Sequence, residues 1–325
     1  MADHKSGKDT ALDFCLATGE DFEGVMAISG DVYGGMDYLP QQYHRWMQDP
    51  NRRTFVAKRE GQVVALESVL VVDDGQTAVG QGLRVAPWER GRNVAGLIRS
   101  FVEDFLKSEF PAVKIFRVTR IENPPPGLLS KYRLLHSKER GQGAALVLTV
   151  TPGEVPEIVH SLNSRLDKEG LCFQPPVNLG ADDVSRIYQN ESVIEKLLPA
   201  TMLIQSWLPV HPKRSNLDYL LTQGITWLAD KVEDPNFLSL GSPPFRVPLE
   251  ENSFQLDIDL FGTDPRSAKM HFLAQLLAAT EAMKEGVVFC SLYMELALFP
   301  VLDVFTEGIK RYNLWKEQLV MEKEL

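Results

Sequence analysis

The strongest single indication of the fold is the stretch Gly82-Leu83-Arg84-Val85-Ala86-Pro87-Trp88-Glu89-Arg90-Gly91-Arg92-Asn93-Val94-Ala95-Gly96-Leu97-Ile98. An apolar strand pattern leads into a loop rich in Arg and Gly, and the loop opens a long amphipathic helix. The start of a helix offers four N–H groups without intrahelical partners, and its dipole favours negative charge. Arg90 and Arg92 add fixed positive charge. Small residues at Gly91, Ala95 and Gly96 allow a pyrophosphate to approach the backbone closely. The stretch therefore predicts an anion-binding site between a strand and a helix.

The segments around this loop predict an α+β domain over residues 11–152. Apolar residues recur at helical spacing over 94–106, which is the clearest helical periodicity in the chain. Strand patterns occupy 12–16, 54–58, 63–72, 77–85, 114–119 and 144–150, and helical patterns occupy 18–29, 39–48 and 127–135. Thr18 and Asp21 form a capping-box pattern at the first helix. The order predicts an antiparallel meander from 54 to 85, followed by alternating helices and strands.

Residues 153–325 predict a second domain, because Thr151-Pro152-Gly153 resembles a domain boundary. Helical patterns cover 178–198, 217–230 and 304–309, and residues 314–321 fit a terminal strand or helix. Residues 254–260 alternate apolar with polar residues, Asp264 and Pro265 begin a helix, and 287–292 is a strand pattern. This strand–helix–strand order echoes the first half and suggests a structural repeat. An acidic residue at that helix start would repel pyrophosphate, so we expect no coenzyme site there.

Composition limits the class of protein. The chain has 325 residues, of which 44% are apolar and 24% charged, enough for two globular domains. A net charge of −10 argues against nucleic acid and anionic membranes as partners. Cys15, Cys172 and Cys290 are scattered, which argues against a disulfide framework or a metal site. Residues 1–10 read as a polar, disordered leader, and no apolar run approaches the ~20 residues of a membrane span. We therefore expect a cytoplasmic protein.

The loop resembles the acyl-CoA loop of the GCN5-related N-acetyltransferases, whose pattern is Arg/Gln-x-x-Gly-x-Gly/Ala after Val-x-Pro. Val85-x-Pro87 is present, and Arg90, Val94 and Ala95 fit the pattern. Asn93 stands at the middle glycine, and Asn tolerates the left-handed backbone better than most residues. Together with the element order, the resemblance implies a mixed, mostly antiparallel sheet flanked by helices. It also implies acetyl-CoA as co-substrate. The repeated strand–helix–strand order predicts two such α+β domains in tandem, the second degenerate.

The resemblance also implies individual roles. The strand ending at Val85 would splay from strand 114–119, and the backbone of Leu83 and Val85 would pair with pantetheine amides. The Val85 N–H is a candidate to polarise the thioester carbonyl. Tyr132, on the helix after that second strand, would protonate the departing thiolate. The expected cofactor contacts are Leu83, Arg84, Val85, Arg90, Gly91, Arg92, Asn93, Val94, Ala95, Gly96, Asn123 and Tyr132.

The acceptor site is expected in the same half. An amine must be neutral to attack a thioester, so the site needs a base or a water chain leading to one. Glu67 lies mid-strand among apolar residues, where a carboxylate faces either solvent or a cleft; it could act as base or bind an ammonium. The glycine-containing loop 31–38 offers Tyr33, Asp37 and Tyr38 to a small cationic acceptor, and Ser68 adjoins Glu67. The loop's glycines suggest a lid.

Most of the chain is similar to a narrower group, the vertebrate histidine N-acetyltransferases. The similarity is densest in residues 33–40, 65–68 and 82–96. It implies acetylation of the α-amine of free L-histidine, whereas the residues by themselves support only a small amine. Two alternatives remain open: an acetyltransferase for proteins or peptides, and a non-catalytic acyl-CoA sensor. The oligomeric state is not predicted.

Overall fold

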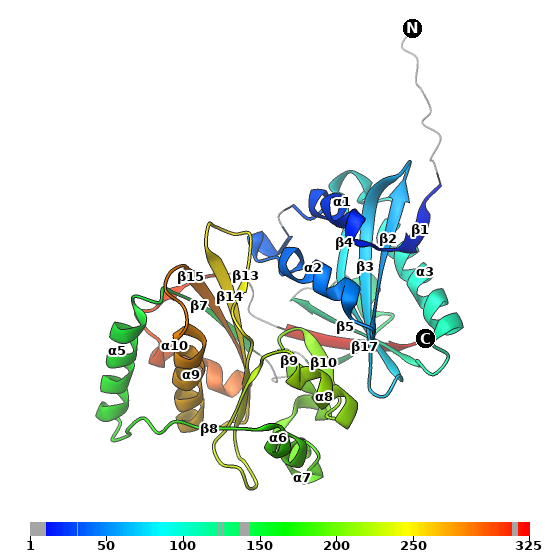
Figure 1. Cartoon of the computed structure of the whole chain (residues 1–325). Coiled ribbons are helices and arrows are strands. Elements are labelled where there is room, and N and C mark those ends of the chain that lie inside the picture. The colour runs from blue at the N-terminus through cyan, green and yellow to red at the C-terminus, as the bar shows by residue number, and fades with distance from the viewer. Residues whose placement is uncertain (1–10, 31, 122–123, 125, 137–143, 314–317) are drawn as a thin grey trace.

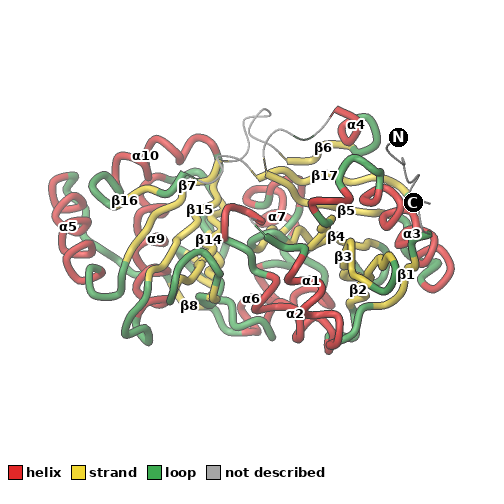
Figure 2. Tube along the Cα trace, turned by 90° about the horizontal axis from the view of Figure 1, so that it is seen from above, coloured by secondary structure: helices red, strands yellow, loops and turns green. Residues whose placement is uncertain are grey.

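The chain folds into two β-sheets that lie side by side, each accompanied by helices (Figures 1 and 2). The computed structural model describes residues 11–30, 32–121, 124, 126–136, 144–313 and 318–325. The first sheet contains, in spatial order, β1 (Asp13–Leu16), β2 (Arg52–Arg59), β3 (Gln62–Val72), β4 (Thr77–Val85), β5 (Ile115–Ile121), β17 (Gln318–Glu324) and β6 (Arg133–His136). β4 and β5 are parallel, and the other neighbours are antiparallel. The predicted mixed, mostly antiparallel sheet is therefore confirmed.

Helices cover both faces of the first sheet. On one side lie α1 (Phe22–Ala27) and α2 (Leu39–Gln48), on the other lies α3 (Val94–Glu109), and a short α4 (Pro126–Leu129) follows β5 (Figure 1). The α3 side chains buried at four-residue spacing are Val94, Ile98, Val102 and Leu106. This apolar stripe packs on β3 and β2 and fixes the direction of α3, so its first turn ends up beside the end of β4.

The second sheet carries the remaining elements. Its strands run in the order β16 (Lys310–Arg311), β7 (Ala144–Val150), β15 (Val287–Met294), β14 (Ser253–Phe261), β12 (Leu238–Gly241), β11 (Thr226–Ala229) and β8 (Val177–Asn178), with β13 (Phe245–Arg246) paired to β14. A separate pair joins β9 (Leu203–Gln205) and β10 (Leu208–Val210). The helices are α5 (Val155–Lys168), α6 (Ala181–Ile187), α7 (Glu191–Leu197), α8 (Arg214–Leu221), α9 (Pro265–Thr280) and α10 (Phe299–Phe305). β14 and β15 are parallel around α9, so the predicted strand–helix–strand order is confirmed.

The two sheets exchange strands across the expected division at residue 152. β7 precedes that division but pairs with β15 in the second sheet. β17, close to the C-terminus, inserts between β5 and β6 in the first sheet, where it is the red strand of Figure 1. Each sheet therefore needs chain from both sides of residue 152, which couples the folding of the two halves.

Three expected elements differ from the structure, and one that the sequence leaves open is settled. The helix expected over 127–135 ends at Leu129, because Arg133–His136 form an edge strand on β17, a partner almost 200 residues away in sequence. The helix expected over 217–230 splits into α8 and β11, with Gly224 in the left-handed region between them at φ +72°. The helix expected over 304–309 lies earlier, as α10. The terminal element is the strand β17, and residues 314–317 lie outside the described part.

Apolar residues from both halves pack together. Met36 of the first half joins Val147, Val247, Phe289 and Tyr293 in one buried cluster. A second cluster brings residues of β3 and β4 against α6, α7 and α8. The two halves thus share cores, and a cavity between them has fixed walls. Among the described helices, none is long and apolar enough to cross a membrane.

Candidate active site

The strands β4 and β5 separate partway along their length. They pair over four residues, from Thr77 with Ile115 to Gly80 with Val118, and beyond this point both strands continue without pairing to each other. Gly82 has φ +71°, and a Cβ there would lie 3.0 Å from the Trp46 ring, so this turn of the strand requires glycine. The predicted splay is confirmed, and it opens a slot whose backbone edges can accept and donate hydrogen bonds to a ligand.

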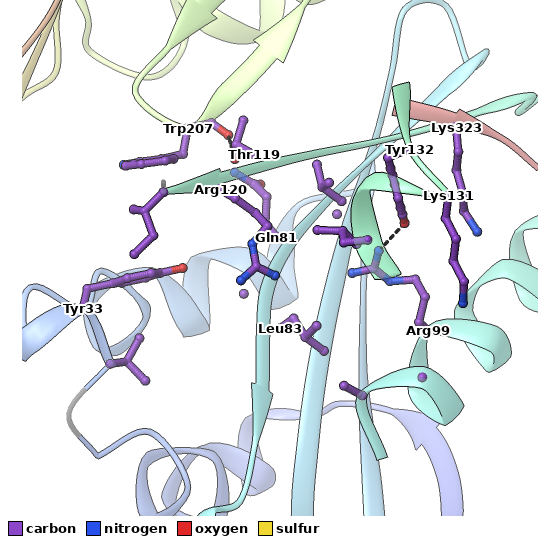
Figure 3. A pocket seen from close by; sticks show the side chains of 18 of the residues that line it. Tyr33, Gln81, Leu83, Arg99, Thr119, Arg120, Lys131, Tyr132, Trp207 and Lys323 are labelled. Carbon is purple, nitrogen blue, oxygen red and sulfur yellow. Dashed lines mark hydrogen bonds between the residues drawn. The ribbon is translucent and has the colours of Figure 1, made fainter. Parts of the chain in front are cut away.

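A cavity of about 670 Å³ occupies this slot (Figure 3). Arg99, Lys131, Tyr132 and Lys323 line one side, and the far end opposite them is lined by Tyr33, Gln81, Thr119, Arg120 and Trp207. Further lining residues are Tyr38, Leu83, Ala95, Gly96 and Gln255. Trp207 and Gln255 belong to the second half, which therefore forms part of the wall. The volume suits a small molecule together with part of a cofactor arm.

The loop before α3 has the backbone of an anion site. Gly91 and Asn93 have φ +81° and φ +58°, and Asn93 is the N-cap of α3 without a side-chain capping bond. The expectation that Asn keeps the left-handed conformation of the motif glycine is thus confirmed. A Cβ at Gly96 would lie 2.4 Å from the Asn93 Oδ1, so glycine at 96 accommodates the larger residue at 93. Arg90 and Arg92 are exposed on this loop. The residues present fit a diphosphate at the N-terminus of α3.

Glu89 anchors the loop, a role that sequence reasoning missed. It is 4% exposed and accepts a hydrogen bond from the Arg59 Nε at 3.0 Å. The Arg92 guanidinium lies 3.8 Å from the second carboxylate oxygen of Glu89. An acidic residue beside two arginines in a loop carries no sequence signal that it is buried. Its partner Arg59 belongs to strand β2 and not to the loop.

Arg99 connects Glu67 with Tyr132. Its guanidinium forms an ion pair with the Glu67 carboxylate and donates a hydrogen bond to the Tyr132 hydroxyl oxygen at 2.7 Å (Figure 3). Glu67 is 0% exposed and does not line the cavity, whereas Arg99 and Tyr132 do. Burial raises the pKa of Glu67, and Arg99 opposes this rise. Burial also works to lower the pKa of Arg99, but the Glu67 carboxylate and the Tyr132 oxygen together raise it, so Arg99 stays charged.

This arrangement prepares Tyr132 to donate a proton. Arginine is a donor only, so it occupies a lone pair of the phenolic oxygen and leaves the phenolic hydrogen available. Burial raises the pKa of Tyr132 despite the opposing effect of Arg99, which keeps the hydroxyl protonated at neutral pH. Tyr132 lies in the turn between α4 and β6 rather than on the expected helix. Arg99, one turn beyond the anion loop, had no sequence signal that set it apart from other helix arginines.

The loop 32–38 forms part of the far end. Its 3₁₀ turn η2 (Val32–Gly35) holds Tyr33 at φ +52°, and the Tyr33 and Tyr38 rings stack at 6.1 Å. Asp37 does not line the cavity: its carboxylate pairs with buried Arg84 and accepts the Leu39 N–H at 2.9 Å. Any side chain at Gly35 would meet Leu249 of the second half. The loop is therefore tied down on both sides, which weakens the expectation of a mobile lid.

The remaining predicted residues are placed as follows. The Ser68 hydroxyl lies 2.9 Å from the Thr54 hydroxyl and accepts a bond from Arg52, and Ser68 does not line the cavity. The Arg84 side chain points to Asp37, so only its backbone could serve a cofactor. Neither Val85 nor Val94 lines the cavity: Val94 is buried in the core, and Val85 is partly buried against it. Asn123 lies outside the described residues. Within the described residues, no group of three metal-ligating side chains comes together.

The fold and the slot are those of the GCN5-related N-acetyltransferase fold. A tandem protein of this fold from the clavulanic acid biosynthesis pathway superimposes with a TM-score of 0.52, at 11% identity, over 97% of this chain and 98% of its own. The model of the histidine N-acetyltransferase C-terminal domain matches residues 172–295. Histidine N-acetyltransferases of Oreochromis niloticus and Scomber australasicus are 36% and 37% identical, each over 97% of this chain and 94% of the relative. The chain belongs to the histidine N-acetyltransferase family, and it is an acyltransferase.

Proposed function

We propose that the protein transfers the acetyl group of acetyl-CoA to the α-amine of free L-histidine, giving N-acetyl-L-histidine and CoA. The observation that carries the proposal is one continuous cavity, with Ala95 and Gly96 at the start of α3 at one end and Tyr33 and Trp207 at the other. Arg99 and Tyr132 line the side of the cavity opposite Tyr33 and Trp207 (Figure 3). A cofactor entering at α3 would thus bring its thioester to Tyr132, with the acceptor on the far side. The similarity to named histidine N-acetyltransferases supports the acceptor.

In the proposed reaction the amine attacks the thioester directly. The amine nitrogen bonds to the carbonyl carbon, the carbon–sulfur bond breaks, and the sulfur takes the proton of the Tyr132 hydroxyl. The amine nitrogen loses one proton to solvent, and solvent then reprotonates Tyr132. Arg99 is a positioning residue here, because it holds the phenolic oxygen at 2.7 Å. Glu67 acts through Arg99, which replaces the earlier expectation that it serves directly as base.

Arg120 supports a free amino acid as acceptor. It lines the far end of the cavity, is exposed to it, and forms no ion pair within the described part of the chain. A cation without a carboxylate partner attracts the α-carboxylate of a free amino acid. The first residue of a peptide has no free α-carboxylate, because that group forms the peptide bond. Trp207 and Gln255 of the second half also line the cavity, which favours a small acceptor over a protein segment.

The test is a thiol-release assay with acetyl-CoA and each free amino acid in turn, followed by peptides that begin with histidine. Turnover with L-histidine and weak or no turnover with the peptides is the expected result. Faster turnover of the peptides would favour the peptide acetyltransferase. Acetyl-CoA binding without turnover of any acceptor would favour the sensor and overturn the proposal.

A further inference from the structure

The polar face of β14 is buried, and it packs against the pair of β9 and β10 from the same half of the molecule. Gln255, Asp257 and Asp259 alternate with apolar residues, a pattern that on its own suits a solvent-facing side. In the structure they are 3%, 0% and 2% exposed. Burying carboxyl groups in this way costs free energy unless donors surround them, so the face needs an explanation beyond strand formation.

Asp257 is surrounded by hydrogen-bond donors. The Gln255 Nε2 donates to its Oδ1 at 2.7 Å, and the Tyr293 hydroxyl lies 3.4 Å from the same oxygen. The Ser206 hydroxyl donates to Oδ2, and the Ser206 N–H donates to Asp259 at 2.6 Å. Burial raises the pKa of Asp257, but these three side-chain donors oppose the rise. Burial raises the pKa of Asp259 well above its ordinary value, and the Asp257 carboxylate adds to this rise.

This network sets the orientation of the Gln255 amide. Because Asp257 holds the NH₂ group of the amide, the carbonyl Oε1 of Gln255 points away from Asp257. Gln255 also lines the cavity, and Asp257, which holds its amide, is bonded to Ser206, the neighbour of the cavity residue Trp207 in the chain. Trp207 is itself held edge-on against Tyr293, with ring centroids 5.8 Å apart. The Gln255 carbonyl therefore lies beside aromatic walls, about where the side chain of the amine substrate would lie.

We infer that the second half selects the acceptor by its side chain, with the Gln255 carbonyl accepting the ring N–H of a neutral imidazole. The inference rests on the proposed function and names the residue that makes it specific. An aliphatic side chain would leave the buried carbonyl without a donor, and an acidic one would face both this oxygen and Asp257. Asp257 is a positioning residue, since it acts only through the amide of Gln255.

The test compares L-histidine with its two ring-methylated forms, τ-methyl-L-histidine and π-methyl-L-histidine, at pH 8. Neither methylated form has a ring N–H when neutral, so the wild type should prefer histidine over both by at least about tenfold in kcat/KM. Gln255→Leu should reduce that preference to about twofold or less, chiefly by lowering kcat/KM for histidine. Asp257→Asn should reduce it as well although Gln255 is unchanged, because a neutral amide at 257 can hold Gln255 in either orientation.

Gln81→Leu is the matched control. Gln81 lines the same cavity, but its Oε1 already accepts a bond from Arg52 at 2.8 Å, so the variant should keep the wild-type preference. Thermal melting of all three variants separates folding from recognition. A wild type that acetylates histidine and methylhistidines equally, or a Gln255→Leu variant that keeps the preference, would overturn the inference alone. A wild type that acetylates no amino acid would instead overturn the proposed function, and the inference with it.

Discussion

Helix α3 of the first half and helix α9 of the second each leave one strand of a parallel pair and lead back to the other. At α3 the N-cap is Asn93, with a left-handed backbone and no side-chain capping bond. At α9 the N-cap is Asp264, whose carboxylate accepts the Ser267 N–H at 2.7 Å. The strands differ in the same sense: β4 and β5 pair over four residues and then separate, whereas β14 and β15 pair over seven.

The comparison shows how one strand–helix–strand unit is opened or closed to an anionic cofactor. In the first unit, β4–α3–β5, the helix N–H groups have no side-chain cap and the strands leave a slot, so we call it the open unit. The second unit, β14–α9–β15, is the closed unit. In the second, an acid occupies the helix start and the ladder is continuous, which argues against a site for pyrophosphate or pantetheine. The expectation that the second half binds no coenzyme stays a prediction, but it now has a geometric reason. The second half contributes cavity wall instead, through Trp207 and Gln255.

The largest expected effect is on kcat, and it follows from a change at Tyr132 if catalysis takes place only beside the open unit. Tyr132→Phe should lower kcat by about 10²- to 10⁴-fold, the range over which a positioned acid contributes, with little change in acetyl-CoA affinity. Tyr312→Phe, in the second half, is the control and should leave kcat close to wild type. Thiol release measures kcat, and calorimetry measures acetyl-CoA binding. A Tyr132→Phe enzyme with wild-type kcat would place the acid elsewhere.

The two halves also neutralise their buried carboxylates differently. Glu67 faces the Arg99 cation, whereas Asp257 faces neutral donors. Glu67→Gln leaves a buried charge without its counterion and should lower the free energy of unfolding by about 3 kcal/mol. Asp257→Asn should cost clearly less, because its partners carry no charge to be stranded. Urea denaturation at pH 7.5 gives both values.

The Glu67 variant also discriminates between the two roles considered for this residue. A general base lost to glutamine would abolish turnover at every pH without a matching loss of stability. A positioning role predicts the stability loss together with a partial fall in kcat, since Tyr132 would be held less firmly. Wild-type stability combined with lost activity would restore Glu67 as the base.

Much of the first half was predictable, because its sequence signals are local. The α3 periodicity, the Thr18–Asp21 capping box and the anion loop each depend on neighbouring residues. What escaped prediction depends on distant partners. Arg133–His136 became a strand because β17 lies beside it, and Glu67 proved internal because Arg99 reaches it from another element. Likewise, the alternation in β14 predicted the strand but not the burial of its polar face, because the residues that cover it come from the distant pair of β9 and β10.

A smaller effect tests the helix starts directly. Asn93→Asp places in the open unit the acid that the closed unit has, and Asp also tolerates a left-handed backbone. One negative charge beside the diphosphate should raise the KM for acetyl-CoA about tenfold, equivalent to about 1.4 kcal/mol. Asp264→Asn is the matched control: Asn is an equally good N-cap, so stability and kinetics should stay near wild type. An unchanged KM in Asn93→Asp would contradict the assignment of the diphosphate to this loop.

The smallest expected effect compares a buried histidine in each half. Burial lowers the pKa of His136 in β6 to about 4 and that of His271 in α9 to about 3. Both values lie below the unfolded value of about 6.5, so the unfolded chain binds more protons, and stability falls as the pH drops below about 6.5. Between pH 6.5 and 5.5 each histidine should cost about 1 kcal/mol. His136→Phe and His271→Gln should each remove that part of the acid sensitivity, as measured by urea denaturation at several pH values. Because the halves exchange β7 and β17, we expect one unfolding transition in which both contributions appear together. Two transitions, each responding to one variant only, would show that the open and closed units unfold separately.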